Sequence, residues 1–245
     1  MTAGTRKRAD GGASTSMVNT NVSLEFRTRY LEPEELAVRS WMGKRQCSSF
    51  LDVGAGDGRF SRMALELGAG RVVALDIDED CIGELRQLRQ CIAGAEKRLE
   101  IVHADIRTYD IRDGSFQTVM LLGNTFSGFY DSWEGGERST QAEMLGRLMR
   151  ASSGYVLLSL QRPESFDLFR RFYEANRWDF YGYDEESGVK RLRWRMKDGR
   201  DLEIRSQHFR KEQIERILSD AGVPRGSFSI EPINDINWLV EIRSG

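Results

Sequence analysis

The residues best suited to hold a ligand form a glycine-rich loop at 50–61, FLDVGAGDGRFS. Gly54, Gly56 and Gly58 alternate with other residues after an apolar run, and Asp52 lies two residues before the first glycine. Such spacing allows a sharp turn and a close approach to a nucleotide-bearing cofactor. A dinucleotide loop reads G-x-G-x-x-G/A, but the sixth position from Gly54 is Arg59, which disfavours NAD. Asp52 repels phosphates and is suited to reach, directly or through water, the ammonium of a cationic amino-acid ligand.

Two more acids follow predicted strands further along the chain. Asp76 lies in RVVALDID (71–78), and Asp105 lies in LEIVHADI (99–106). The carboxyl ends of parallel strands meet at one edge of a sheet, where ligands bind. Asp76 alone does not distinguish cofactors, because NAD-binding proteins also carry an acid there. The alternative role of Asp105 is a helix N-cap, and that of Gly58 is close helix packing.

Together, Asp52, the spaced glycines, Asp76 and Asp105 resemble the motifs of class I S-adenosylmethionine-dependent methyltransferases over about residues 48–160. The resemblance implies that the glycine loop approaches the methionine end, that Asp76 binds the ribose hydroxyls, and that Asp105 and Ile106 contact the adenine. It also implies that LLGNTFSGF (121–129) lines the methionine moiety and admits the acceptor. GNTF is most similar to the glycine N-methyltransferase kind. The implied cofactor-binding residues are Tyr30, Asp52, Gly54, Ala55, Gly56, Asp57, Gly58, Asp76, Ile77, Asp105, Ile106, Gly123 and Asn124.

Alternation of short apolar runs with helical patterns predicts a parallel sheet covered by helices. Strands are expected at 48–54, 71–78, 99–106, 116–124 and 153–161, and helices at 59–68, 79–94, 137–152 and 211–222. Strands at 227–233 and 237–243 are expected to form an antiparallel edge. The expected fold class is α/β: a Rossmann-like, seven-stranded, mostly parallel sheet with helices on both faces, an antiparallel C-terminal edge strand, and a lid insertion containing a β-hairpin.

This organisation predicts five segments along the chain. They are a disordered tail at 1–20, an N-terminal helical segment at 21–47, the S-adenosylmethionine-binding core at 48–161, the insertion or lid at 162–206, and the C-terminal helix and edge strands at 207–245. Within the insertion, the spacing of Phe166, Phe169 and Phe172 favours a packed helix over an aromatic cage for a cationic acceptor. The insertion is expected to select the acceptor and exclude water.

The hairpin of the insertion carries arginines at alternate positions, Arg191, Arg193 and Arg195. A three-residue loop at 197–199 places Arg195 opposite Asp201 and Arg193 opposite Glu203, whereas a two-residue loop would oppose charged and apolar residues. Cross-strand pairing favours the first register. The arginines are then expected to form a neutralised, solvated face rather than a surface for nucleic-acid phosphates.

No group of residues identifies a catalytic base. An amine or hydroxyl acceptor must lose a proton during methyl transfer. His208, after the hairpin, is one candidate, although a structural histidine is the favoured interpretation. Tyr130 and Asp131, past GNTFSGF, are expected to line the acceptor pocket or to form an ordinary loop, and Tyr130 is the second catalytic candidate. His103 is expected to be packed within the third strand. Tyr30 either closes over the methionine end or anchors the N-terminal helix as a core aromatic.

Composition limits the partners. The 245 residues are 40% hydrophobic and 30% charged, and the formal net charge is −2, so nothing favours a nucleic-acid or membrane partner. No apolar run approaches the ~20 residues of a membrane helix. Three cysteines without disulfide or metal spacing favour a reducing compartment, and a cytoplasmic location without a metal is expected. The N-terminal segment lacks the apolar core of a secretory signal.

The favoured function is transfer of a methyl group from S-adenosyl-L-methionine, by in-line displacement, to an N or O atom of a small-molecule acceptor. An RNA or protein acceptor with the same cofactor is the alternative. The chain lacks the Asp/Asn-Pro-Pro-Tyr/Phe motif that marks the family's amino-methylating DNA and protein members. An NAD-dependent oxidoreductase and a non-catalytic cofactor-binding module stay open as further alternatives. No residue pattern indicates the acceptor or the oligomeric state.

Overall fold

The computed structural model of the protein describes residues 22–129, 140–175, 179–195 and 201–244. Several sequence predictions fall outside these ranges: the tail at 1–20, the candidates Tyr130 and Asp131, and the loop at 197–199 of the hairpin. Within the described ranges, no helix combines the length and the hydropathy that crossing a lipid bilayer requires.

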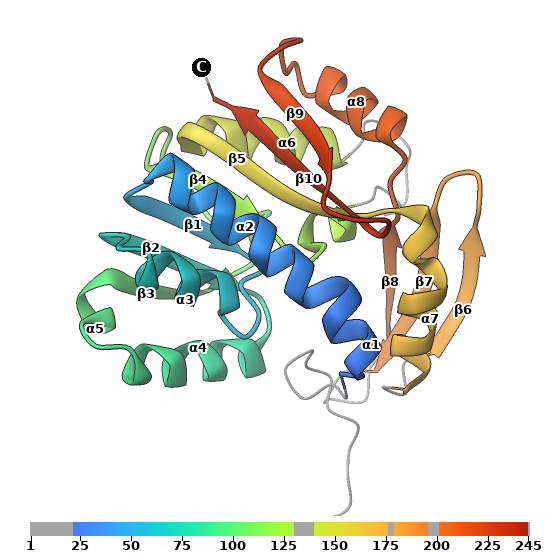
Figure 1. Ribbon diagram of the computed structural model, residues 1–245, viewed down its shortest axis with the longest axis horizontal. Helices are drawn as coiled ribbons and strands as arrows, with labels where there is room; N and C mark the ends of the chain where they lie inside the picture. Colours follow the sequence, from blue (N-terminus) through green and yellow to red (C-terminus); the bar gives the residue numbers. More distant parts are fainter. Residues whose placement is uncertain (1–21, 130–139, 176–178, 196–200, 245) are drawn as a thin grey trace, which may run out of the picture.

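A seven-stranded sheet forms the centre of the fold, in the order β3-β2-β1-β4-β5-β10-β9 (Figure 1). The first five strands of this order are parallel, and β10 is antiparallel to both of its neighbours. The predicted Rossmann-like sheet is therefore confirmed. The reversed strand β10 is the second strand from one edge of the sheet, and β9 is the edge strand. The strands are β1 (Ser49–Val53), β2 (Arg71–Asp76), β3 (Leu99–His103), β4 (Phe116–Leu121), β5 (Ser152–Gln161), β9 (Phe228–Pro232) and β10 (Asn237–Arg243).

Helices cover both faces of this sheet. The helices of the described ranges are α1 (Leu24–Phe26), a π-helical turn η2 (Arg27–Leu31), α2 (Glu32–Arg45), α3 (Arg59–Glu66), α4 (Glu79–Cys91), α5 (Ala95–Arg98), α6 (Thr140–Ala151), α7 (Phe166–Ala175) and α8 (Lys211–Asp220), with 3-10 turns η3 (Thr125–Phe129) and η4 (Pro163–Ser165). Of these, α1 and α7 pack in a separate cluster with the insertion. Capping fixes some of the boundaries. The Asp78 carboxylate accepts the N–H of Asp80 at 2.8 Å where α4 begins, and Gln46 ends α2 with a left-handed φ of 50°.

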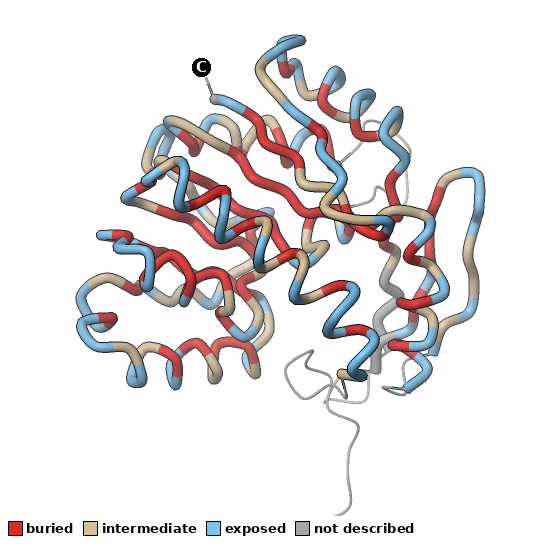
Figure 2. The backbone as a smooth tube through the Cα atoms, in the orientation of Figure 1, coloured by how far each residue is buried: buried red, intermediate tan, exposed pale blue. Residues whose placement is uncertain are grey.

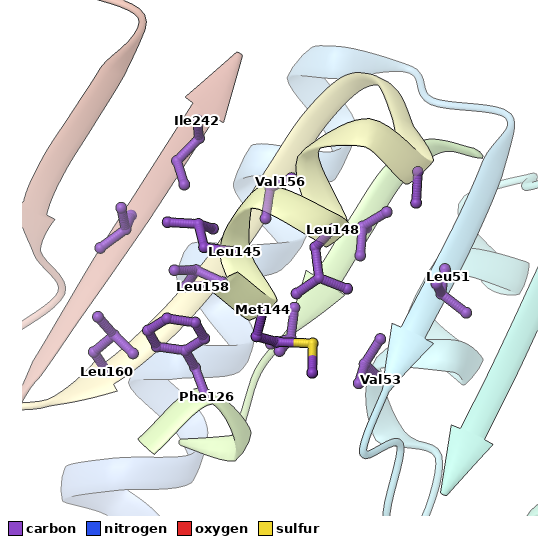
Figure 3. Close-up of a cluster of buried hydrophobic side chains, with 14 of the residues drawn as sticks. Leu51, Val53, Phe126, Met144, Leu145, Leu148, Val156, Leu158, Leu160 and Ile242 are labelled. Carbon is purple, nitrogen blue, oxygen red and sulfur yellow. The ribbon is translucent and has the colours of Figure 1, made fainter. Parts of the chain in front are cut away.

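Alternate residues of the strands pack into two separate cores, because successive side chains of a strand point to opposite faces. Leu51 and Val53 of β1 join Leu145 and Leu148 of α6 in one core, which Figure 3 shows. Phe50 of β1 joins the core formed with α2, α3 and α4 on the other face. Buried residues accordingly run through the central strands (Figure 2). Burial on both faces explains why these strands read as continuous apolar runs.

The insertion forms a second, three-stranded antiparallel sheet in the order β6-β7-β8, made of β6 (Asp179–Asp184), β7 (Val189–Arg195) and β8 (Asp201–Gln207). The predicted hairpin register is confirmed: Arg195 pairs with Asp201, and Arg193 pairs with Glu203. The packed helix predicted from the phenylalanine spacing is α7. The strand β6 was not predicted, because its aromatic residues were grouped with those of the helix.

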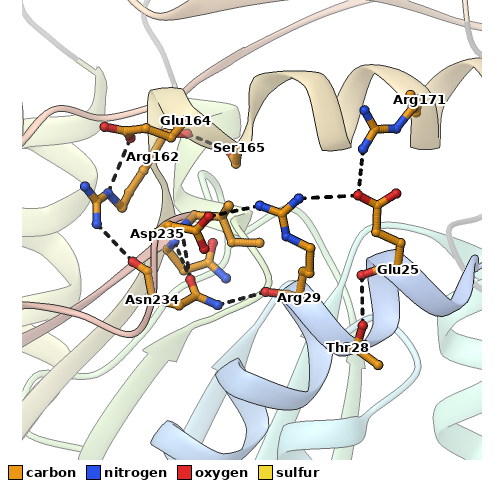
Figure 4. A network of polar contacts seen from close by, with 11 residues as sticks. Glu25, Thr28, Arg29, Arg162, Glu164, Ser165, Arg171, Asn234 and Asp235 are labelled. Carbon is orange, nitrogen blue, oxygen red and sulfur yellow. Dashed lines mark hydrogen bonds and ion pairs between the residues drawn. The ribbon is translucent and has the colours of Figure 1, made fainter.

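Ion pairs and hydrogen bonds connect the N-terminal helix to the insertion and to the turn between β9 and β10 (Figure 4). Glu25 accepts bonds from Arg29 at 3.3 Å and from Arg171 of α7 at 2.8 Å. Arg29 also bonds the Asp235 carboxylate at 2.9 Å, and its carbonyl accepts the Asn234 side-chain amide at 2.8 Å. The N-terminal helix, α7 and the C-terminal turn thus form one connected surface.

Candidate functional site

The glycine loop between β1 and α3 turns in three left-handed steps. Gly54, Gly56 and Gly58 have φ angles of 66°, 58° and 80°, a region that favours glycine. The N–H groups of Gly54 and Ala55 both donate to the Leu75 carbonyl, at 2.8 and 3.1 Å, and so fix the loop against the end of β2.

The three glycines serve different purposes. A Cβ on Gly54 would lie 2.5 Å from Thr125, and one on Gly58 would lie 2.6 Å from Leu88 and 2.7 Å from Leu85. Close packing therefore explains these two positions, and the alternative role predicted for Gly58 fits its surroundings. A Cβ on Gly56 would meet nothing within 4 Å. Gly56 is thus the glycine whose backbone faces open space, where a ligand would approach.

Asp76 lies at the end of β2 and faces the loop. Its Oδ2 accepts the N–H of Gly56 at 2.8 Å, and its Oδ1 accepts the N–H of Asp78 at 2.9 Å. A carboxylate has about four lone-pair positions, so acceptor capacity is left for hydroxyl groups. The neighbouring Ile77 is exposed, and Asp57 caps the start of α3 by accepting the N–H of Arg59 at 3.1 Å.

Asp52 lies on the buried side of the glycine loop rather than on its open side. Only 2% of the residue is exposed, and its Oδ2 accepts the Ser61 hydroxyl at 2.7 Å. Burial raises the pKa of Asp52 to about 6, although the Ser61 hydrogen bond works in the opposite direction. The carboxylate therefore braces β1 against α3, and its predicted contact with an ammonium stays a prediction.

Asp105 follows β3 at the same edge of the sheet. Its carboxylate forms a bidentate ion pair with the Arg107 side chain, in which Nη2 donates to Oδ2 at 2.6 Å and Nε donates to Oδ1 at 3.0 Å. The backbone N–H of Arg107 also donates to Oδ1, at 2.9 Å. The bond to the Arg107 side chain lowers the pKa of Asp105. Arg147 of α6 holds the loop that follows β3. Its Nη1 donates to the carbonyls of Ile106 at 2.6 Å and of Arg107 at 2.7 Å. Arg147 also donates to the carbonyl of Tyr109.

Gly123 and Asn124 follow β4, and both have left-handed φ angles, 64° and 66°. The Asn124 side chain closes its own turn by donating to Ser127 at 2.5 Å, and its Oδ1 accepts the N–H of Gln161 at 3.2 Å. Asn124 therefore connects the ends of β4 and β5.

Glu34 of α2 is a site residue that the sequence did not reveal. It is fully buried, and its Oε1 accepts the N–H of Gly123 at 2.9 Å and the Ser159 hydroxyl of β5. Its Oε2 pairs with Arg59, the residue that follows the glycine loop. Burial works to lower the pKa of Arg59, but the Glu34 carboxylate outweighs it and raises that pKa. The pair joins α2, α3 and the ends of β4 and β5 beside Gly123.

Tyr30 is a core aromatic in the structure. It is 4% exposed and packs edge-on against Phe169 of α7, with ring centroids 4.8 Å apart. Burial, followed by the nearby Glu34 carboxylate, raises the pKa of Tyr30 well above its ordinary value. The alternative prediction, that Tyr30 anchors the N-terminal helix, describes these contacts. A contact with the methionine end stays a prediction.

The two histidines differ from each other in burial. His103 was predicted to be packed within β3, and this is wrong: its side chain is 46% exposed, because β3 is an edge strand. It contacts the Ile77 carbonyl at 3.0 Å and Glu79 at 3.0 Å. His208 is fully buried, and its Nε2 lies 3.1 Å from Nζ of Lys190, which is also buried. The sequence contained a signal for Lys190, since it shares the apolar face of β7 with Leu192.

Comparisons with known proteins agree with this arrangement. Residues 50–135 match a methyltransferase domain family. Ribosomal RNA small subunit methyltransferase A of Rhodopseudomonas palustris is 41% identical over 70 residues, which make up 29% of this chain and 23% of that protein. The chain thus matches less than a quarter of the length of this curated relative.

Solved structures show a similar fold over most of the chain. A protein from Pyrococcus horikoshii OT3 superimposes with a TM-score of 0.62 at 20% identity, covering 94% of both chains. Magnesium protoporphyrin IX methyltransferase from Synechocystis, with bound S-adenosylhomocysteine, superimposes with a TM-score of 0.55 at 16% identity, covering 86% of this chain and 81% of the other. Residues 50–135 thus match a methyltransferase domain, and the fold over most of the chain is similar to that of solved class I S-adenosylmethionine-dependent methyltransferases.

Proposed function

We propose that the protein transfers a methyl group from S-adenosylmethionine to an N or O atom of a small-molecule acceptor. The observation that carries this proposal is the row of groups at the carboxyl ends of three adjacent strands. Gly56 after β1 faces open space, Asp76 ends β2, and Asp105 follows β3. An elongated ligand with methionine, ribose and adenine parts fits along such a row.

The residues present suit the cofactor. Gly56 leaves room for close approach, and the carboxylate of Asp76 keeps acceptor positions for two ribose hydroxyls. When bound, S-adenosylmethionine supplies an activated methyl group on a sulfonium. The work of the protein is to position the acceptor in line with that methyl group and to exclude water, which can contribute ~7–11 kcal/mol.

Several features support a small-molecule acceptor. The chain has a net charge of −2 and lacks the Asp/Asn-Pro-Pro-Tyr/Phe motif. The β7–β8 register sets two of the arginines of β7 opposite acidic residues along the backbone. The similarity to a protoporphyrin methyltransferase over 86% of the chain points in the same direction.

Calorimetric titration with S-adenosylhomocysteine, with NAD in parallel, tests the cofactor. We expect micromolar binding of S-adenosylhomocysteine and no binding of NAD. Asp76→Ala should weaken binding by about 1–3 kcal/mol through lost charged hydrogen bonds, whereas the exposed Asp110→Ala should not change it. Binding of NAD alone, or an unchanged affinity in Asp76→Ala, would contradict the proposal.

The second candidate acceptor is RNA, because a ribosomal RNA methyltransferase is 41% identical over 70 residues. Association with RNA that weakens steeply between low and moderate salt would favour it, since phosphate contacts release counterions. Association that is absent, or independent of salt, would leave the small-molecule acceptor as the better explanation.

We also propose that α7 and the small sheet act as a lid over the acceptor. Phe26 and Tyr30 of the N-terminal segment pack in one cluster with Phe169 and Phe172 of α7. Deleting 163–205 would remove the lid, but it would also expose this cluster. Point substitutions on the small sheet therefore test the lid more cleanly.

A further inference from the structure

Lys190 lies buried in β7, the middle strand of the small sheet, and only 1% of it is exposed. Its Nζ donates to Oε1 of Gln161 at 2.7 Å and lies 3.1 Å from Nε2 of His208. The rings of Phe169 and Tyr173 face it with centroids at 4.9 and 5.1 Å, within cation–π range. No ion pair to Lys190 is formed within the described ranges, and burial alone lowers its pKa to about 7.

The hydrogen bonding of this pair fixes the proton on His208. Burial, and then the ammonium of Lys190, lower the pKa of His208 well below its ordinary value, so the imidazole is neutral. When Lys190 is protonated its ammonium only donates, so Nε2 accepts and Nδ1 carries the proton. Nδ1 is buried and has no partner among the described residues. With Lys190 protonated, the pair therefore presents an unused N–H donor beside a positive charge.

Gln161 connects this pair to the candidate cofactor site. Gln161 is the last residue of β5, and its N–H donates to Oδ1 of Asn124 at 3.2 Å. Glu34 accepts the N–H of Gly123, the residue before Asn124, at 2.9 Å and pairs with Arg59, which follows the glycine loop. A continuous series of polar groups thus leads from the glycine loop to Lys190.

The charges at this edge are not balanced. Arg59 is paired with the buried Glu34, whereas the protonated form of Lys190 has no carboxylate partner in the described part of the chain, so burial lowers its pKa and a bound carboxylate would restore its charge. A bound sulfonium would add a second positive charge at the same edge. Buried charges without partners are costly, so an anionic group on the acceptor would balance the positive charges of Lys190 and of the sulfonium.

We propose that Lys190 and His208 bind a carboxylate group of the methyl acceptor, whose aromatic or apolar body packs against the ring cluster of α7 and β6. This inference rests on the proposed function and specifies the acceptor class. The ring centroids of Phe166, Phe169 and Tyr183 lie 6.2, 6.0 and 5.8 Å from that of His208, and Phe166 stacks on Tyr183 at 4.0 Å. These rings supply the apolar wall beside the unused donor.

The test uses benzoate and acetate as probes, titrated by calorimetry into the full chain saturated with S-adenosylhomocysteine. Benzamide serves as the neutral isostere of benzoate. We expect benzoate to bind at least about tenfold more tightly than benzamide, and Lys190→Met to lose about tenfold or more of the benzoate affinity. Arg191→Met, on the exposed face of the same strand, should stay within about twofold of the wild type.

Nitrogen-15 NMR gives a signal that benzoate would not change if Lys190 and His208 only stabilised the fold. The chain has two histidines, so the signals are simple to assign. Benzoate should shift Nδ1 of His208 while leaving His103 unchanged. If benzoate and acetate both fail to bind, if phosphate binds more tightly than benzoate, or if Lys190→Met binds benzoate like the wild type, the inference is overturned.

The outcomes also separate this inference from the proposed function. Binding of S-adenosylhomocysteine without any carboxylate binding would overturn the acceptor class and leave the methyltransferase proposal intact. Lys190-dependent binding of benzoate to a chain that does not bind S-adenosylhomocysteine would support the anion site and contradict the proposed function.

Discussion

The buried Lys190 should make the stability of the ligand-free protein depend on pH. Burial lowers the pKa of Lys190 from 10.5 to about 7, while the unfolded chain keeps the ordinary value. Between these two values the unfolded chain binds a proton that the folded chain releases. The free energy of unfolding must therefore fall as the pH falls from about 10.5 to about 7 and then level off.

The size of the effect follows from the shift. Each pKa unit corresponds to about 1.4 kcal/mol, so the wild type should lose about 2 kcal/mol of unfolding free energy between about pH 9 and about pH 7.5. Lys190→Met removes the titrating group and should abolish this slope. At about pH 7.5 the variant should be more stable than the wild type by about 2 kcal/mol. This figure allows for the hydrogen bond from Lys190 that Gln161 loses in the variant.

Guanidinium unfolding followed by tryptophan fluorescence measures these differences. Most other groups lie outside this window: His208, whose pKa is lowered by burial, costs stability only below its ordinary value of 6.5, and Tyr30 and Tyr173, whose pKa values are raised by burial, cost stability only above 10. Burial also raises the pKa of the Cys47 thiol from 9.0, and this lowers stability near pH 9 equally in the wild type and in Lys190→Met, so that it cancels in the comparison. Arg191→Met is the matched control and should keep the wild-type slope. Equal slopes in the wild type and Lys190→Met would refute the reasoning.

Four further substitutions separate packing from binding. Gly58→Ala should lower the unfolding free energy by about 2–4 kcal/mol, because its Cβ would meet α4 at 2.6 Å. Gly56→Ala, whose Cβ meets nothing within 4 Å, should mainly weaken S-adenosylhomocysteine binding in calorimetry. Glu34→Ala should cost about 3–5 kcal/mol in denaturant unfolding, since it leaves Arg59 charged and mostly buried. Arg147→Ala should weaken S-adenosylhomocysteine binding about tenfold by releasing the loop after β3.

Matched controls accompany these substitutions. Glu32→Ala, on an exposed position of α2, should change stability by less than about 0.5 kcal/mol. Arg150→Ala, on an exposed position of α6, should leave cofactor affinity unchanged. The assignments fail if Gly56→Ala destabilises as much as Gly58→Ala, if Glu34→Ala unfolds like Glu32→Ala, or if Arg147→Ala and Arg150→Ala bind alike.

The central sheet could be predicted from the sequence because its signals are local. Strands buried on both faces read as apolar runs, and the helices between them repeat every three to four residues. The register of β7 and β8 followed from opposite charges, with Arg193 set against Glu203. His103 was misplaced because the position of β3 at the edge of the sheet depends on strand order, which a single run of residues does not reveal.

The residues of the candidate site also divide into those that the local sequence reveals and those that it does not. The glycine loop and Asp76 are adjacent to the strands that position them, so spacing identified them. Glu34 contacts Gly123 across 89 residues of sequence, and Lys190 is buried by α7 and the end of β5 rather than by its own hairpin. A lysine on the apolar face of an amphipathic strand was the available signal, but the neighbouring arginines made it look like part of a charged surface.

The aromatic cluster of α7 also has a consequence for the order of folding. It joins Phe26 and Tyr30 near the start of the chain to Phe169 in the middle and Ile236 near the end. The pair of Arg29 and Asp235 closes a separation of 206 residues. Contacts so distant in sequence are slow to form, because the loop between them must close first. During synthesis, the glycine loop and its neighbouring strands leave the ribosome long before Ile236. The nascent chain should therefore acquire the candidate cofactor site early and complete the candidate acceptor site only after Ile236 has been synthesised.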